Sequence, residues 1–191
     1  ILDNMIAEGR MEPTIVVTPN GSDFPNEQFR WDRESICQFV INDILPHMTE
    51  NYNASDDPSR RAFAGLSQGG ATVGYMMFTY PEAFDTYAFL SAPYMGDTNL
   101  DFTIPELKDK TIFFGYGDYD FVQTRSLYKL YPDADGNMVR LASKEEGSIW
   151  EYMYGLAEAD VDFTSINYAY GHQWALWRKL MVNICEDILW K

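Results

Sequence analysis

Residues 65–69, Gly-Leu-Ser-Gln-Gly, hold a serine between two glycines. A short apolar run, Ala62 to Leu66, precedes the serine and a helix-like segment follows it, which predicts a strand-to-helix turn. So tight a turn strains the serine backbone, and small neighbours avoid collisions with it. The turn is either an ordinary strand-to-helix turn with a helix-capping serine or a turn that exposes a nucleophilic serine. In the second case Ser67 attacks, and the backbone N–H of Gln68 points at the developing oxyanion.

A serine hydroxyl needs a neighbouring base to act as a nucleophile at neutral pH. The chain contains two histidines. His47 follows Pro46 inside an expected helix, whereas His172 comes just after an expected strand and just before the closing helix. Functional groups of open α/β sheets collect at the carboxyl ends of the strands. His172 is therefore the candidate base.

A carboxylate should orient the imidazole of His172 and stabilise its cation. Two candidates, Asp118 and Asp120, follow the apolar segment 110–117. We predict Asp118, because it stands directly at the end of the expected strand, and keep Asp120 as the alternative. The alternative without a catalytic role is that both aspartates belong to a solvated acidic turn. The order serine, aspartate, histidine along the chain is that of α/β-hydrolases.

Alternating strands and helices must position these side chains. Strands are expected at residues 14–18, 61–66, 86–93, 110–118 and 161–169, and helices at 32–52, 68–79, 121–131, 143–159 and 173–190. Asp32 is the expected N-cap of the first helix, and Pro46 is expected to kink that helix or mark its last part. The alternation predicts an α/β fold, a mostly parallel sheet with helices on both faces.

Charge and composition limit the classes of partner. The 191 residues carry a net charge of −15. This balance argues against nucleic acid and against anionic membrane surfaces, both of which attract basic proteins. No stretch approaches the run of about 20 apolar residues that spans a bilayer. The two cysteines, Cys37 and Cys185, do not make a metal-binding set.

Three segments, AEGRMEPTIVVTPNG, RRAFAGLSQGG and GHQWALWRKLM, resemble the esterase-D-like carbohydrate esterases, which include the feruloyl and acetyl-xylan esterases attached to xylanases. The resemblance covers nearly the whole chain and is weakest in residues 119–160. It implies an α/β-hydrolase fold with Ser67 as nucleophile, Asp118 as acid and His172 as base. It also implies a secreted enzyme that hydrolyses feruloylated or acetylated xylan without a metal or an organic cofactor.

The triad alone does not identify the ester, because siderophore esterases and other small-ester hydrolases share the fold and the turn. We favour a feruloyl esterase and keep an acetyl-xylan esterase or another small-ester esterase as alternatives. A non-catalytic α/β-hydrolase-like carbohydrate-binding protein is the alternative outside the enzymes. Tyr94, Tyr119 and Trp174 are expected to stack on a phenolic acyl group or a sugar.

The family that the chain resembles has a further strand before TIVVTPNG, ending in a His-Gly-type loop that supplies a second oxyanion N–H. Residues 1–191 contain no such segment, so we expect them to be the C-terminal portion of one α/β-hydrolase domain, without its N-terminal strands. An upstream segment of the same protein is then expected to complete the sheet. The family topology also places the first long helix and the last helix on one face, which suggests a Cys37–Cys185 disulfide.

Overall fold

A parallel four-stranded sheet in the order β1-β2-β3-β6 forms the centre of the molecule. The computed structural model describes residues 1–19, 32–94, 98–120, 130–132, 138–140 and 149–190. The four strands are Ala62–Leu66 (β1), Thr86–Leu90 (β2), Thr111–Gly117 (β3) and Thr164–Tyr168 (β6). They confirm four of the five expected strands. A separate antiparallel pair joins Leu130–Pro132 (β4) to Met138–Arg140 (β5).

The two inner strands are apolar because both of their faces are covered. Every residue of β2 is buried, and so is every residue of β3 after Thr111. All three strand pairs of the four-stranded sheet are parallel. The carboxyl ends of the four strands therefore lie along one edge of the sheet, where an α/β sheet carries its functional groups.

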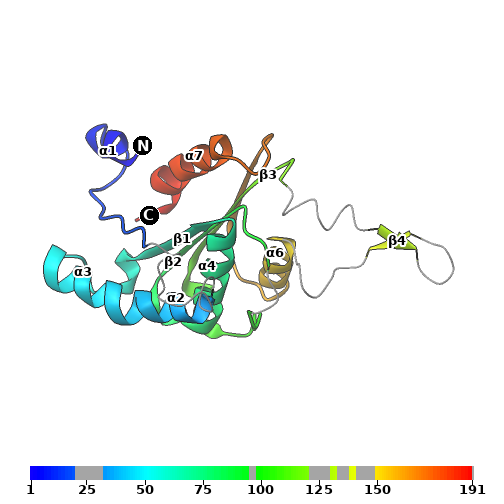
Figure 1. The fold of residues 1–191 in the computed structure, drawn as a ribbon, viewed down its shortest axis with the longest axis horizontal. Helices are drawn as coiled ribbons and strands as arrows, with labels where there is room; N and C mark the ends of the chain where they lie inside the picture. The colour runs from blue at the N-terminus through cyan, green and yellow to red at the C-terminus, as the bar shows by residue number, and fades with distance from the viewer. Residues whose placement is uncertain (20–31, 95–97, 121–129, 133–137, 141–148, 191) are drawn as a thin grey trace.

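Helices cover both faces of the sheet, as expected (Figure 1). One face carries Arg33–Phe39 (α2), Val40–Ile44 (η2), Leu45–Tyr52 (α3), Gln68–Thr79 (α4) and Ile149–Glu158 (α6). The other face carries Trp174–Asn183 (α7) and Ile184–Ile188 (η6), and Leu2–Ala7 (α1) packs against these from outside. Short 3₁₀ turns occupy Pro58–Arg60 (η3), Pro81–Ala83 (η4) and Pro105–Asp109 (η5). The helices expected at 32–52, 68–79 and 173–190 are confirmed.

Two other expected helices fall partly outside the described residues. Of the helix expected at 143–159, the part at Ile149–Glu158 is confirmed, and residues 143–148 lie outside the described residues. Of the helix expected at 121–131, residues 121–129 lie outside them as well. Its last two residues belong to β4, so the prediction is wrong there. Within the described residues, no helix is long and apolar enough to cross a membrane.

Each face of the sheet has its own hydrophobic core. On the α4 side, the ring of Tyr152 packs against Phe89 and Phe114 of the sheet. Gly74 of α4 lets this ring approach, since a Cβ there would stand 2.4 Å from the Tyr152 hydroxyl. On the other face, the buried Leu176 of α7 belongs to a smaller cluster of its own. Burial of these side chains holds the helices at fixed positions relative to the strand ends.

The first long helix runs through a proline without stopping. The side chain of Asp32 accepts a hydrogen bond from the N–H of Ser35 at 3.3 Å, which confirms the expected N-cap. Pro46 has no N–H to donate, and η2 just before it is a wider π turn in which the N–H of Leu45 bonds to the carbonyl of Val40. Pro46 therefore opens the last part of the helix, α3, as the sequence suggests.

The strand expected at residues 14–18 is wrong. These residues form no regular structure, and Ile15, Val16 and Val17 are 50%, 55% and 43% exposed. An apolar run becomes a strand only where a neighbouring strand takes up its backbone N–H and C=O groups. Within the described part of the chain, β1 has β2 as its one strand neighbour, so nothing pairs with residues 14–18.

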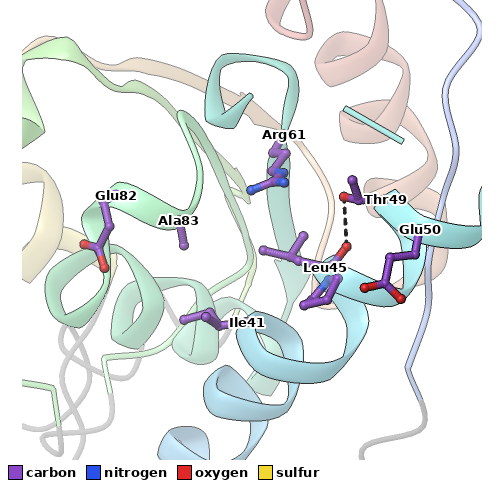
Figure 2. A pocket seen from close by; sticks show the side chains of 8 residues that line it. Ile41, Leu45, Thr49, Glu50, Arg61, Glu82 and Ala83 are labelled. Carbon is purple, nitrogen blue, oxygen red and sulfur yellow. Dashed lines mark hydrogen bonds between the residues drawn. The ribbon is translucent and has the colours of Figure 1, made fainter. Parts of the chain in front are cut away.

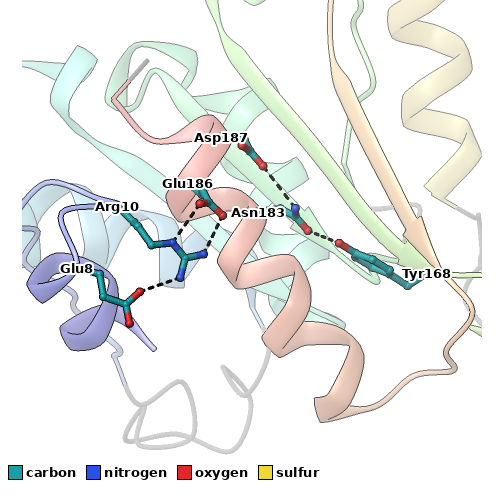
Figure 3. A network of polar contacts seen from close by, with 6 residues as sticks. All are labelled: Glu8, Arg10, Tyr168, Asn183, Glu186 and Asp187. Carbon is teal, nitrogen blue, oxygen red and sulfur yellow. Dashed lines mark hydrogen bonds and ion pairs between the residues drawn. The ribbon is translucent and has the colours of Figure 1, made fainter.

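The short helix α1, which the sequence analysis did not identify, lies against the end of α7 (Figure 3). Met5 and Met11 pack with Cys185 in a third apolar cluster. The guanidinium of Arg10 donates two hydrogen bonds to Glu186, at 3.1 and 2.9 Å. The amino-terminal segment is thus attached to the last helix rather than to the sheet.

The two cysteines lie on opposite faces of the sheet, so the disulfide hypothesis is wrong. Cys37 belongs to the core beside α4, and Cys185 packs with α1 beyond the other face. Both are free and buried. Burial raises the pKa of the Cys37 thiol to about 12, so this thiol stays protonated and acts as a small apolar side chain.

Candidate active site

Ser67 occupies the tight turn between β1 and α4 with a strained backbone. Its φ is 55° and its ψ is −119°, a conformation that residues other than glycine seldom adopt. A Cβ on Gly65 would lie 2.2 Å from the carbonyl carbon of Gly69, and one on Gly70 would lie 2.5 Å from the Cβ of Ala92. The glycines are therefore required for the turn to close, and the turn holds the serine side chain at the carboxyl end of β1.

The imidazole of His172 lies between a serine and an aspartate. Its Nε2 is 2.9 Å from the Oγ of Ser67, and its Nδ1 is 3.0 Å from the Oδ1 of Asp120. The side chain of Asp120 is fully buried and that of His172 is 16% exposed. A carboxylate can only accept, so Nδ1 carries the proton and Nε2 presents its lone pair to the serine hydroxyl. This arrangement can activate an oxygen nucleophile.

The prediction that Asp118 contacts the imidazole is wrong, and the alternative, Asp120, lies there instead. Asp118 still pairs with the sheet, since its N–H donates to the carbonyl of Tyr168 at 2.9 Å. Its exposed carboxylate accepts a hydrogen bond from the side chain of Asn167. The chain then turns back on itself through a bond from the N–H of Asp120 to the carbonyl of Gly117 at 3.0 Å. That turn brings Asp120 under the imidazole.

Gln68, the predicted oxyanion donor, is the first residue of α4. The first N–H groups of a helix have no acceptor inside the helix, and the helix dipole favours negative charge beside them. Gln68 directly follows the serine, so its backbone N–H lies close to the atom that would attack. The donor role of Gln68 stays a prediction that this position suits.

Two of the three predicted stacking residues are exposed, and each lies next to a residue that contacts His172. Trp174 is 64% exposed, and its ring packs at 85° against Trp177, 5.1 Å away between centroids. The ring of Trp177 in turn packs at 88° against His172, at 5.0 Å. Tyr119 is 73% exposed and directly precedes Asp120. Both residues are therefore accessible to a ligand.

The third predicted stacking residue, Tyr94, packs against the hydrophobic core. Its ring packs edge-on against Tyr152 at 5.8 Å, and its hydroxyl donates to the carbonyl of Thr98 at 3.2 Å. Tyr94 is half-buried in the cluster beneath α4. A ligand would meet less of this ring than of Tyr119 or Trp174, so its role in stacking stays a prediction.

An open hollow of about 350 Å³ lies at the other end of the sheet (Figure 2). It is lined by Ile41, Leu45, Pro46, Thr49, Glu50, Arg61, Glu82 and Ala83. Arg61 directly precedes β1, and Ala83 comes shortly before β2, so the hollow marks the amino ends of the strands. It is separate from Ser67, His172 and Asp120, which lie at the carboxyl ends. In the described parts of the chain, no cluster of His, Cys, Asp and Glu could hold a metal ion.

The chain is similar to known proteins over nearly its whole length. A family model described as "Putative esterase" matches residues 1–188. An endo-1,4-beta-xylanase/feruloyl esterase from Xylanibacter ruminicola is 34% identical over 122 residues, which are 62% of this chain and 16% of that protein. The chain thus spans less than a fifth of the length of this curated relative.

Two solved structures have the same fold. A ferulic acid esterase matches with a TM-score of 0.69 and 18% identity, over 98% of this chain and 75% of that one. A ferulic acid esterase from Anaeromyces mucronatus matches with a TM-score of 0.62 and 16% identity, over 97% and 68%. The parallel sheet with helices on both faces is therefore an α/β-hydrolase fold, as expected.

Proposed function

The chain belongs to the Esterase family, and we propose that it is a serine carboxylic-ester hydrolase acting on feruloyl esters of plant cell-wall xylan. The hydrogen-bonded series Ser67, His172, Asp120 carries this proposal. The relative named as a xylanase/feruloyl esterase supports the substrate class. The fold shared with ferulic acid esterases is consistent with it.

In the first half of the reaction, Oγ of Ser67 attacks the ester carbonyl while its proton moves to Nε2 of His172. The buried Asp120 carboxylate stabilises the imidazolium that forms. The negative charge on the former carbonyl oxygen accepts a hydrogen bond from the N–H of Gln68. The intermediate then collapses, and His172 gives its proton to the leaving sugar oxygen.

In the second half, a water molecule takes the place of the sugar alcohol. His172 removes a proton from this water, which attacks the carbonyl carbon of the acyl-serine. The bond between Oγ of Ser67 and the acyl carbon breaks, and Ser67 recovers its proton from His172. Ferulic acid leaves, and the enzyme returns to its starting protonation state.

We assign the phenolic ring or the adjoining sugar to the exposed faces of Trp174 and Tyr119. These rings lie next to the residues that hold and orient the base. Aromatic stacking of this kind favours flat ligands and adds to the burial of apolar surface. An acetyl group has no ring to stack, so the two platforms favour a feruloyl over an acetyl ester.

The test compares two esters, methyl ferulate and 4-nitrophenyl acetate, with the natural chain that contains these residues. We expect turnover of both, with the higher kcat/KM for methyl ferulate. Replacing Trp174 by Ala is expected to raise KM for methyl ferulate about tenfold and to change the acetate reaction little. Turnover of the acetate alone would replace the feruloyl proposal by acetyl-xylan esterase. Turnover of neither ester by folded protein would overturn the esterase proposal.

We also propose that the free edge of β1 pairs with a strand from an upstream segment of the same protein. The supporting observation is that β1 is only partly buried, whereas the inner strand β2 is wholly so. An unpaired strand edge presents N–H and C=O groups that bind another strand. Hydrogen exchange of the Ala62–Leu66 amides is expected to be slower in the natural chain than in residues 1–191 alone. Equal exchange would refute the pairing.

Cell-wall xylan is a polymer outside any cell that degrades it, so we propose that the enzyme is secreted. No nucleic acid and no membrane takes part in the proposed reaction. Methyl ferulate hydrolysis is expected in the cell-free culture medium of the source organism. Activity confined to washed, lysed cells would contradict secretion.

A further inference from the structure

Ser91, the residue that directly follows β2, has a backbone conformation that its environment must enforce. Its φ is 50°, in the left-handed region that favours glycine, and its side chain is fully buried. Asn53 and Asp160 also have positive φ, but each closes a helix, where this conformation is common. Ser91 instead follows β2, just as Ser67 follows the neighbouring strand β1. A glycine would adopt this conformation more easily, so the presence of a serine suggests that its hydroxyl has a role.

The hydroxyl of Ser91 accepts a hydrogen bond from the indole N–H of Trp177, at 2.9 Å. The backbone of Ser91 is itself held, because its N–H donates to the carbonyl of Gly115 in β3 at 2.7 Å. Trp177 is thus tied to the centre of the sheet, although it belongs to α7. The same indole ring is the one that packs at 88° against the imidazole of His172.

Hydrogen bonds to Asp120 and Ser67 hold the two nitrogens of the His172 imidazole. Bonds at Nδ1 and Nε2 hold two points of the imidazole but tolerate a tilt of its plane about the line through them. Proton transfer from Ser67 needs the lone pair of Nε2, which lies in that plane, to point at Oγ. A perpendicular aromatic ring at 5.0 Å resists the tilt.

We propose that Ser91 and Trp177 are positioning residues for the catalytic base. Ser91 anchors the indole of Trp177, and the indole holds the plane of the His172 imidazole in line with Ser67. This inference rests on the proposed function, because it assigns a role toward the same reaction. It predicts that the Ser91 hydroxyl affects the rate of attack rather than the binding of the ester.

Ser91→Gly separates this role from a merely structural one. The change removes the hydroxyl and also relieves the positive φ, so stability is not expected to fall. We expect kcat for methyl ferulate to fall about tenfold with KM unchanged. Asn53→Gly is the matched control, since it relieves the same conformation at the end of α3. It is expected to leave both constants as they are.

Labelling by a fluorophosphonate measures the nucleophile without the natural ester. Oγ of Ser67 forms a bond to phosphorus, fluoride leaves, and the serine proton passes to His172. We expect the second-order labelling rate to fall about tenfold in Ser91→Gly, in Trp177→Phe and in the double variant alike. Phe keeps an aromatic ring but has no N–H to donate, so the three variants lose one shared hydrogen bond.

The outcomes separate the two proposals. Unchanged labelling in Ser91→Gly, or a loss that follows a lower melting temperature, would overturn the positioning role and leave the esterase proposal standing. Fully additive losses in the double variant would show two independent effects and would also overturn it. Folded wild-type protein that is not labelled at Ser67 would refute the proposed catalytic series, and the positioning role with it.

Discussion

Replacement of Ser67 by alanine is expected to lower kcat for methyl ferulate by about 10⁶-fold, because the acyl-enzyme can no longer form. The hydroxyl is the only part of the side chain that the variant loses, and Nε2 of His172 loses its partner at 2.9 Å. The turn between β1 and α4 should persist, since the glycines that let it close are unchanged. Initial rates at saturating ester give kcat, and intact-protein mass measures the acyl-serine.

Ser165→Ala is the matched control for this variant. Ser165 is an exposed residue of the edge strand β6, and its loss is expected to leave kcat within about twofold. Circular dichroism should give the same folded signal for both variants. A Ser67→Ala protein that retains a tenth of the wild-type kcat would mean that another group attacks the ester.

Asp120→Asn is expected to lower kcat by about 10⁴-fold, with little change in KM. The buried carboxylate keeps the proton on Nδ1 of His172, at 3.0 Å, and stabilises the imidazolium. An amide of the same shape can donate to Nδ1 and so favours the tautomer with its proton on Nε2. That tautomer cannot accept the proton of Ser67. The measurement is the full dependence of rate on ester concentration.

Asp118→Asn makes the same chemical change two residues away. This carboxylate is exposed and bonded to Asn167, so kcat is expected to change by less than about threefold. The pair of variants therefore decides between the two aspartates with equal changes in charge and volume. A larger loss in Asp118→Asn than in Asp120→Asn would refute the assignment of Asp120 as the acid.

Local features of the sequence were enough to select Ser67 and His172 as candidate site residues. Gly65 predicts a tight strand-to-helix turn because the clash that it avoids involves the backbone of Gly69, only a few residues away. His172 stands out because few histidines compete with it and because it follows a strand. The two inner strands can also be predicted from the sequence, since a strand buried on both faces is apolar throughout.

Contacts between segments that are distant in the sequence decided the features that the sequence analysis predicted wrongly. The turn after β3 makes Asp120, not Asp118, the neighbour of His172, and that depends on pairing with residues 168–170. An apolar run such as 14–18 satisfies the pattern of a strand but stays irregular without a partner strand beside it.

The faces on which Cys37 and Cys185 lie, and the tie between Ser91 and Trp177, likewise depend on how helices pack across the sheet. A local pattern specifies the conformation of a segment and which of its faces is apolar. It does not specify which distant atom a polar group meets, because that depends on packing and pairing across the whole sheet. The sequence by itself therefore predicted the type of chemistry and the candidate nucleophile and base, whereas the tertiary structure decided which carboxylate and which other side chains contact the histidine.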